Sequence, residues 1–364
     1  MTLSSTIVRS STVLKRRISA TPAAPVTEPV RKISRRCESN LRFIADVSPR
    51  TKKFQAPGHD SFLHQRFIAD SVVGRGDFGK VVKAASRGSG STSAVKIVKI
   101  QKLSIVEETL KEAHILKDLP KHQNVLGFLS AWVESCQLFV QTELCASNLL
   151  EFSKSKHFES EVVISYSILD LVTGVAHLHS NGILHVDLKP ENVFVDSRGF
   201  LKIGDFGLAL KIEDAFKAKE VDGDGRYAPV DLLNGHPTTK TDVFSLALMI
   251  LELQTRIPIK KIREEDSAPF KATLDKLPGI FKPLVEPGLN EDPEERPETM
   301  DMRGIAKDIA ESYGDRPAIE WKPVESEVSR AVSHFMTPMV ESEPRSRLPV
   351  GRRLNVRRLD LCHF

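Results

Sequence analysis

The stretch from 185 to 192 contains the residues of this chain that are best suited to chemistry. It brings Asp187, Lys189 and Asn192 close together, and the triplet Asp205-Phe206-Gly207 follows. An aspartate in this pattern accepts the proton of a hydroxyl group, and the lysine neutralises charge on a transferring phosphoryl group. Asn192 and Asp205 would hold Mg²⁺. These residues in this order predict transfer of a phosphoryl group from ATP to a hydroxyl group.

A glycine-rich stretch lies upstream, in the segment 73–81. Glycines at such offsets let a hairpin lie flat over phosphates and donate backbone N–H groups to them. The pattern alone is weak, because an ordinary glycine turn looks the same. The strand–turn–strand context disfavours a dinucleotide-binding fold, in which a helix should follow the glycines. The residues assigned to the nucleotide here are Gly74, Gly76, Gly79 and Val81.

A lysine follows at the end of the next predicted strand, in Ala94-Val95-Lys96. Its ammonium group is placed to hold the α- and β-phosphates of ATP. Glu112 lies in 105–118, whose apolar spacing predicts an amphipathic helix, and an ion pair with Glu112 would fix the direction of Lys96. A solvated lysine and a surface glutamate are the simpler alternative. We assign Lys96 and Glu112, together with Asp187 and Lys189, to the catalytic residues, here called the catalytic set.

Composition divides the chain into three parts. Residues 1–62 are rich in Ser, Thr, Pro and Arg and predict a disordered basic arm, and residues 315–364 predict a flexible tail. The domain between them, 63–314, predicts an α+β, bilobal fold. Its smaller lobe, 63–145, has the short apolar runs of an antiparallel sheet with one helix, and its larger lobe, 146–314, is mostly helical. The long helices expected there are 161–180, 241–254 and 301–312.

Bulk composition excludes several classes of protein. Of the 364 residues, 40% are hydrophobic and 27% charged, which suits a globular core. The net charge of +4 is too small to predict nucleic-acid binding. The four cysteines show neither metal-ligand spacing nor a disulfide framework, so nucleus or cytoplasm is the expected location. No apolar run reaches about 18 residues, and neither a transmembrane segment nor a secretory signal is expected.

Two further positions are typical of protein kinases. Asp242 opens an apolar helix, where kinases place a buried aspartate that braces the catalytic loop. Arg296 suits the arginine that pairs with an acid after the activation segment, and Asp231 stands where that acid is usually a glutamate. With the catalytic set, these positions make the chain resemble a protein kinase.

Among protein kinases, the chain resembles the Wee/Myt family, the inhibitory kinases of cyclin-dependent kinases, over about residues 62–312. The resemblance is carried by the hinge-like stretch 141–145, by the apolar Val186 before the catalytic aspartate, and by the segments 222–227 and 242–246.

The Myt branch is the better match, because Thr142 stands at the gatekeeper position and Phe206 has the Myt identity. Myt kinases usually carry a membrane segment after the catalytic domain, and none is visible here. The resemblance also implies contacts to the nucleotide near the hinge. The residues assigned on this basis are Ala94, Thr142, Glu143 and Cys145.

The resemblance implies a substrate. The expected partner is a cyclin-dependent kinase with its cyclin bound, phosphorylated on neighbouring Thr and Tyr residues of its glycine-rich loop, which would block entry into mitosis. From the residues alone, Lys189 is typical of Ser/Thr-type catalytic loops, so a Ser/Thr kinase of another branch stays open. A non-catalytic scaffold with a kinase fold is a third alternative, disfavoured because the catalytic set is complete.

The activation segment lacks the parts of a phosphorylation switch. Switchable kinases pair a phosphate with an arginine beside the catalytic aspartate, and Val186 stands in that place. The segment 208–226 contains no Ser, Thr or Tyr. We therefore expect activity without phosphorylation of this segment.

The end of the chain repeats a short pattern, Arg-x-Leu-x-apolar. It resembles the motif by which proteins dock on the apolar groove of a cyclin, where leucine fills the groove and arginine meets acidic groups at its rim. A basic solvated terminus is the simpler alternative. The residues that would dock are Arg352, Leu354, Arg357 and Leu359.

Overall fold

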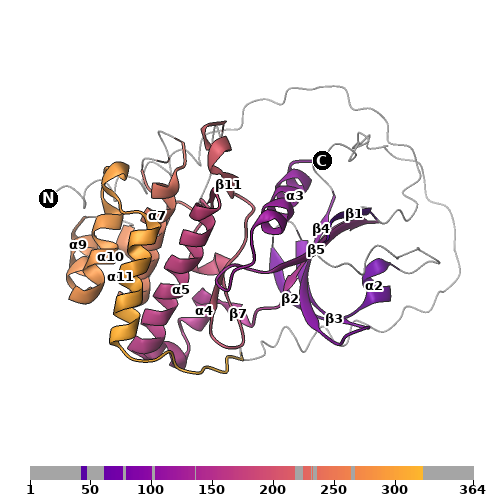
Figure 1. Cartoon of the computed structure of the whole chain (residues 1–364), viewed down its shortest axis with the longest axis horizontal. Helices are drawn as coiled ribbons and strands as arrows, with labels where there is room; N and C mark the ends of the chain where they lie inside the picture. The colour runs from indigo at the N-terminus through magenta and orange to yellow at the C-terminus, as the bar shows by residue number, and fades with distance from the viewer. Residues whose placement is uncertain are drawn as a thin grey trace, which may run out of the picture.

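A computed structural model describes residues 42–46, 61–76, 79–100, 103–135, 137–217, 224–230, 232, 236–263 and 267–322. These residues form two lobes, a smaller one built on a sheet and a larger, mostly helical one (Figure 1). The α+β, bilobal fold expected from the sequence is confirmed. The expected docking residues near the end of the chain lie outside the described residues.

The smaller lobe is built on an antiparallel sheet with the strand order β1-β5-β6-β4-β3-β2. Side chains on β4 alternate between the core and the surface, as the period of a strand requires, with Val95 fully buried. Helix α3, Leu103–Asp118, contacts β5 and β6. The strands are β1 Arg42–Asp46, β2 Phe67–Gly76, β3 Gly79–Ser86, β4 Thr92–Lys99, β5 Phe128–Glu134 and β6 Gln137–Glu143.

Aromatic rings fill a core of the smaller lobe. The rings of Trp132 and Phe139 stack with centroids 5.0 Å apart, and Phe62 meets Trp132 edge-on at 5.1 Å. Phe62 begins the short helix α2, Phe62–Arg66, which is capped by Ser61. The backbone amide of Phe62 donates to both carboxylate oxygens of the buried Glu134, at 2.8 and 2.9 Å. This pairing ties the start of the domain to the sheet.

Strand β1 corrects one sequence-based expectation. Residues 42–46 belong to the arm that composition predicted to be disordered, yet they pair antiparallel with β5. Without β1, β5 would form an edge of the sheet with open backbone donors and acceptors. Composition does not reveal this strand, because the edge supplies backbone partners whatever the arm's side chains are.

The larger lobe is organised around α5 and α7. In α7, residues 241–251 are buried without a break, so this helix runs through the core rather than along its surface. A capping box between Thr238 and Thr241 fixes its start. The helices are α4 Leu149–Phe152, α5 Glu161–Ser180, α7 Thr239–Thr255, α8 Ile259–Arg263, α9 Ser267–Asp275, α10 Lys282–Val285 and α11 Thr299–Ser312.

Short strands and 3-10 turns carry the functional loops of this lobe. One sheet has the order β10-β9-β7, and β8 pairs with β11. The strands are β7 Ser147–Asn148, β8 Ile183–Leu184, β9 Val193–Val195, β10 Leu201–Ile203 and β11 Leu210–Lys211. The 3-10 helices are η2 Lys156–Glu159, η3 Pro190–Asn192, η4 Ile212–Lys217, η5 Gly279–Phe281, η6 Pro287–Leu289 and η7 Pro293–Glu295.

Two observations bear on where the domain ends and on membrane spans. Within the described residues, α5 alone has the length and apolar composition of a membrane span, and 67% of its apolar window is buried inside the domain, as in a core helix.

Residues 315–322, assigned to the flexible tail from composition, pack on the larger lobe through Arg316 and Trp321. The expected boundary at 314 is therefore too early.

Candidate active site

Lys96 and Glu112 meet between the sheet and α3. The Nζ atom of Lys96 donates to Oε2 of Glu112 at 2.7 Å, and Glu112 is 6% exposed. The burial pattern of β4 turns Lys96 toward the cleft side, and the helical period turns Glu112 inward. Burial lowers the pKa of the Lys96 ammonium, but the carboxylates of Glu112 and Asp205 raise it above its usual value. The lysine is thus a fixed cation, directed as expected.

The catalytic loop places three groups around the carboxylate of Asp187. Its Oδ2 accepts hydrogen bonds from Nζ of Lys189 at 2.7 Å and from Nδ2 of Asn192 at 2.8 Å. Its Oδ1 accepts one from the backbone amide of Asp224 at 3.1 Å. Donors on both oxygens fix the orientation of the carboxylate. The arrangement suits a base that accepts a hydroxyl proton from one direction.

Asp242 braces this loop from α7. Its Oδ2 accepts from the backbone amide of His185 at 2.8 Å, and its Oδ1 accepts from that of Val186 at 2.8 Å. Nε2 of His179 lies 2.9 Å from Oδ2. Burial raises the pKa of Asp242, but these hydrogen bonds outweigh it and hold the pKa below its usual value. The predicted bracing role is in agreement with this geometry.

Asn192 and Asp205 offer the donors that a hard divalent cation prefers. Asn192 uses its amide nitrogen on Asp187, since Nδ2 donates to the backbone oxygen at 2.9 Å as well as to Oδ2. Its amide oxygen is then left as the atom that would ligate a cation. Asp205 is exposed and has a φ of 58°, and within the described residues its carboxylate accepts no hydrogen bond. An exposed carboxylate and an amide oxygen, both beside phosphate-binding groups, fit Mg²⁺.

The glycine-rich hairpin has the expected strand–turn–strand form. Gly74 pairs with Val81 and Gly76 with Gly79 across β2 and β3. A Cβ atom at Gly79 would overlap the carbonyl oxygen of Ile97, so a glycine is required there. The turn itself, 77–78, lies outside the described residues.

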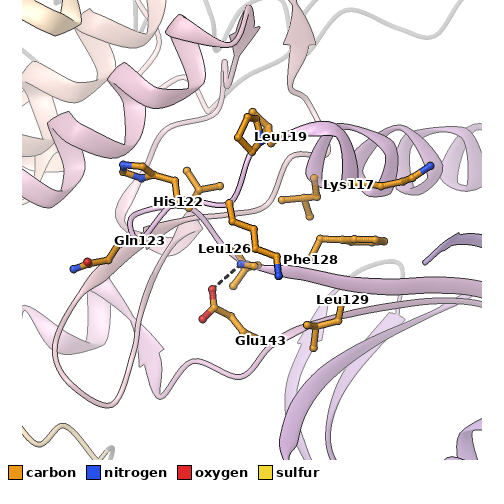
Figure 2. Close-up of a pocket in the computed structure, with 13 residues that line it drawn as sticks. Lys117, Leu119, His122, Gln123, Leu126, Phe128, Leu129 and Glu143 are labelled. Atoms are coloured by element: carbon orange, nitrogen blue, oxygen red, sulfur yellow. Dashed lines mark hydrogen bonds between the residues drawn. The ribbon is translucent and has the colours of Figure 1, made fainter. Parts of the chain in front are cut away.

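The hinge residues divide into two groups. Ala94 pairs with Thr142 in the sheet, which places both at the start of the hinge. The side chain of Glu143 points elsewhere: its Oε1 accepts from the backbone amide of Gly127 at 2.6 Å (Figure 2). The same oxygen lies 3.0 Å from Nζ of Lys202. It lines a pocket of about 430 Å³ between the hinge and the end of α3. Any nucleotide contact from Glu143 is therefore made by its backbone.

Cys145 follows in the hinge and is half-buried. Burial, with the nearby carboxylate of Glu143, raises the pKa of its thiol to about 12. The residue is therefore a neutral thiol at physiological pH, and its expected part in binding ATP is a packing or backbone contact.

A charged network beside the catalytic loop was not assigned to the site from the sequence. Nη2 of Arg226 donates to Oε1 of Glu191 at 2.8 Å and to Oδ2 of Asp224 at 2.7 Å. Nζ of Lys189 lies 3.7 Å from Oδ2 of Asp224. The sequence signal was present, because Asp224 and Arg226 carried part of the family resemblance, but the pairing of Arg226 with Glu191, 35 residues away, depends on the fold.

Val186 lies with apolar residues of the activation segment. It is 2% exposed, has a φ of 69° and clusters with Leu184, Ala215, Ala228 and Leu232. A β-branched residue rarely adopts a left-handed conformation, so surrounding structure must hold it there. The cluster joins the catalytic loop to the activation segment without a phosphate.

The expected pair between Asp231 and Arg296 stays a prediction, because Asp231 lies outside the described residues. Arg296 is buried and donates from Nε to the backbone oxygen of Asn290 at 2.9 Å and from Nη1 to that of Lys240 at 3.0 Å. It therefore anchors the start of α7 through backbone groups.

Similar proteins agree with this geometry. The chain is 37% identical over 240 residues to the membrane-associated tyrosine- and threonine-specific cdc2-inhibitory kinase wee-1.3 of Caenorhabditis elegans, which covers 64% of this chain and 35% of that protein. It is 32% identical over 268 residues to the protein of the same name in Caenorhabditis briggsae, with 69% and 40% covered. A Wee1-like protein kinase of Arabidopsis thaliana is 31% identical over 239 residues, with 63% and 47% covered.

The chain thus spans less than half the length of these three relatives. The protein kinase domain model matches residues 67–356, most of the chain. The match includes both lobes and every residue of the catalytic set. The chain belongs to the protein kinase family.

Proposed function

We propose that this chain is an active, ATP-dependent protein kinase. The observation that carries the proposal is the 2.7 Å pair between Lys96 and Glu112, together with the oriented carboxylate of Asp187. A kinase fold without catalysis has no need of a buried ion pair directed at the phosphate site. A complete and correctly oriented set therefore disfavours the scaffold alternative.

Each residue has a role in the transfer. Lys96 holds the α- and β-phosphates of ATP, and Glu112 keeps its ammonium in place. Asp187 accepts the proton of the substrate hydroxyl as that oxygen attacks the γ-phosphorus, and Lys189 neutralises charge on the transferring group. Asn192 and Asp205 would hold Mg²⁺, which when bound offsets the negative charge of the phosphates. Most of the rate comes from such positioning and electrostatics.

We further propose a cyclin-dependent kinase as the substrate, phosphorylated on Thr and Tyr of its glycine-rich loop. Three similar proteins support this: two are named as cdc2-inhibitory kinases with tyrosine and threonine specificity, and a third as Wee1-like. The outcome would be inhibition of that kinase and a delay of mitotic entry. The test incubates the full chain with a catalytically inactive cyclin-dependent kinase bound to its cyclin, followed by phosphoamino-acid analysis.

Phosphate on Thr and Tyr of the glycine-rich loop supports the proposal, with the Asp187→Asn variant as the control. Phosphate on Ser or Thr of unrelated proteins, with none on the loop, would favour a Ser/Thr kinase of another branch. The hydrogen bond from Lys189 to Asp187 keeps this second candidate open, since a lysine in this position is typical of Ser/Thr-type loops.

Cyclin binding is a separate proposal, and it concerns the last residues of the chain. Two copies of the docking pattern, at Arg352 and Leu354 and at Arg357 and Leu359, would raise the local concentration of a cyclin-bound substrate. Binding of the cyclin complex to the wild type is compared with binding to the double variant Leu354→Ala, Leu359→Ala. A weaker double variant supports docking, whereas equal affinities leave only a basic terminus.

A nuclear or cytoplasmic location is proposed from cysteine usage. The names of two relatives include membrane association. Cell fractionation of the full chain distinguishes a nuclear or cytoplasmic location from membrane association. Recovery of the chain in the membrane pellet would contradict the proposed location.

A further inference from the structure

Residues 315–322, here called the strap, leave the end of α11 and run past α5 toward the middle of the molecule, where they form the yellow segment of Figure 1. The strap contacts α5, the turn between β9 and β10, and the segment that follows the hinge. The catalytic roles assigned above use none of these contacts.

Arg316 is the first anchor of the strap. Its guanidinium donates to both carboxylate oxygens of Asp170 in α5, at 2.8 and 2.6 Å. The same group lies 3.7 Å from the ring centre of Phe200 and 5.4 Å from that of Tyr166. Asp170 is 4% exposed, and its Oδ2 also accepts from the backbone amide of Leu201 at 3.0 Å. A two-point pair at this depth is specific, because a lone carboxylate would be costly to bury.

The strap also covers the tip of the β9–β10 hairpin. The side chain of Ile319 lies against Gly199, which has a φ of 79°, and a Cβ atom there would approach Ile319 to 3.0 Å. The backbone amide of Trp321 donates to the carbonyl of Ser197 at 2.7 Å. The hairpin tip is thus held by side-chain packing and by a backbone hydrogen bond.

Trp321 connects the hairpin to the hinge side of the site. Its indole N–H donates to Oγ of Ser147 at 2.8 Å, and its ring meets that of Phe152 edge-on at 5.1 Å. Ser147 lies in β7, shortly after the hinge residue Cys145, and pairs with Val195 of β9. One side chain therefore contacts both the end of α4 and the strand that leaves the hinge.

The base of the β9–β10 hairpin carries the two cation-ligand candidates. Asn192 directly precedes β9, and Asp205 follows β10. The strap thus connects the hairpin that carries both candidate ligands to the segment that follows the hinge, where contacts to the nucleotide are expected. We propose that Arg316 and Trp321 are positioning residues that hold these two parts of the nucleotide site in one register. The proposal rests on the proposed function, because it assigns the strap to ATP binding.

The test uses the full chain with Trp321→Ala, Trp321→Phe and Ser147→Ala. The matched control is Glu320→Ala, an exposed neighbour in the same segment. The readouts are the Kd of Mg·ADP by calorimetry, and KM for ATP and kcat on a peptide, all well below the Tm of each variant. Trp321→Ala should raise Kd and KM by roughly three- to tenfold, since it loses a hydrogen bond and an aromatic contact. The value of kcat should change by less than about twofold, because the reacting groups stay in place.

Trp321→Phe and Ser147→Ala each remove the indole hydrogen bond and keep most of the packing, so both should show a similar, smaller rise of about twofold. Glu320→Ala should match the wild type. A Trp321→Ala variant with a lowered Tm but unchanged Kd and KM would overturn the inference and leave the strap a stabilising element.

Failure of the proposed function would look different. If the wild type neither binds Mg·ADP nor transfers phosphate, the role of the strap is tested by amide hydrogen exchange instead. Faster amide exchange in 145–147 and 193–203 for Trp321→Ala than for Glu320→Ala supports the coupling of hinge and hairpin. Equal exchange in the two variants overturns it.

Discussion

The ammonium of Lys96 and the carboxylate of Glu112 lie 2.7 Å apart, although one comes from a strand and the other from a helix. The pair forms only when α3 lies close to the sheet. The pair therefore gives the smaller lobe the arrangement that binding of the phosphates by Lys96 requires. The carboxylate of Asp205 also contributes to the field at Lys96, so both lobes meet at this point.

Loss of either key charge should abolish catalysis. We expect Lys96→Ala and Asp187→Asn each to lower kcat/KM by about two to three decades, because single losses in such sites cost about 3–4 kcal/mol of transition-state stabilisation. Circular dichroism should show both variants folded. The control is Lys99→Ala, an exposed lysine on the same strand. An Asp187→Asn variant with more than about a tenth of wild-type activity would mean that Asp187 is not the base.

The activation segment should work without phosphate. Val186 packs on Ala215 and Ala228, so apolar contacts connect the catalytic loop to the segment where other kinases use a phosphate and an arginine. Treatment of the purified chain with a broad-specificity phosphatase should leave peptide phosphorylation within about twofold of the untreated rate. Mass spectrometry of residues 205–231 provides the check. A large loss of activity that maps to a phosphosite there would refute this account.

The structure adds a second way to test the same segment. Val186→Asp would place a charge in a cluster that is nearly free of water, and such a charge costs several kcal/mol unless paired. Activity should fall by more than tenfold. The control is Lys211→Ala, an exposed residue of the same segment.

A histidine behind the hinge should make stability depend on pH. Burial, with the charges of His177, Arg303 and Lys202, lowers the pKa of His122. Its Nδ1 accepts a hydrogen bond from the backbone amide of Asn124 at 3.1 Å, which requires the neutral ring. The unfolded chain then binds a proton near pH 6.5 that the folded chain binds only at lower pH. Stability conferred by the neutral ring is present above that pH and is lost as the pH falls below it.

Thermal unfolding from pH 8 to pH 5.5 at fixed ionic strength measures this effect. The wild type should lose Tm more steeply below pH 6.5 than His122→Gln does, whereas the difference between the two should be constant above pH 7. Parallel curves across the whole range would show that His122 has the same pKa in the folded and the unfolded chain. Its titration would then contribute nothing to the pH dependence of stability.

Much of the site was predictable because kinase chemistry needs particular residue types in a fixed order. Asp187, Asn192 and Asp205 could be assigned from spacing alone, since no other common site uses that order. The evidence for Lys96 and for Glu112 was weaker when each was taken alone. Only the helical period of the apolar residues in 105–118 indicated that Glu112 faces inward. Their pairing then followed from the fold that the catalytic loop implied.

What could not be predicted depends on long-range contacts. The side chain of Glu143 points behind the hinge because Lys202, from β10, meets it there at 3.0 Å. Trp321 docks because Phe152 and Ser147 offer a ring and a hydroxyl at one place. The composition of a segment does not reveal such individual contacts. For this reason the strap was assigned to the flexible tail. An isolated tryptophan in a polar segment was the available signal.

The arm before the domain supplies the last prediction. A disordered arm, as composition predicted for residues 1–62, could be removed without effect on peptide phosphorylation. Strand β1, however, pairs with β5 through Arg42–Asp46 and contacts α3, which carries Glu112. Removal of residues 1–41 should leave Tm and kcat/KM unchanged. Removal of residues 1–60 exposes the edge of β5, and Tm should fall by about 2–4 °C, as expected for a loss near 1 kcal/mol in a domain of this size.

The two deletions serve as controls for each other, since both remove the same basic residues at the start of the chain. Because β1 contacts α3, the longer deletion should also lower kcat/KM on a short peptide, whereas a purely regulatory arm would alter only phosphorylation of the full protein substrate. Differential scanning fluorimetry and a peptide assay on both forms decide the matter. Identical Tm and kcat/KM values for the two deletions would show that β1 contributes nothing to the domain, and the arm would then be dispensable as composition suggested.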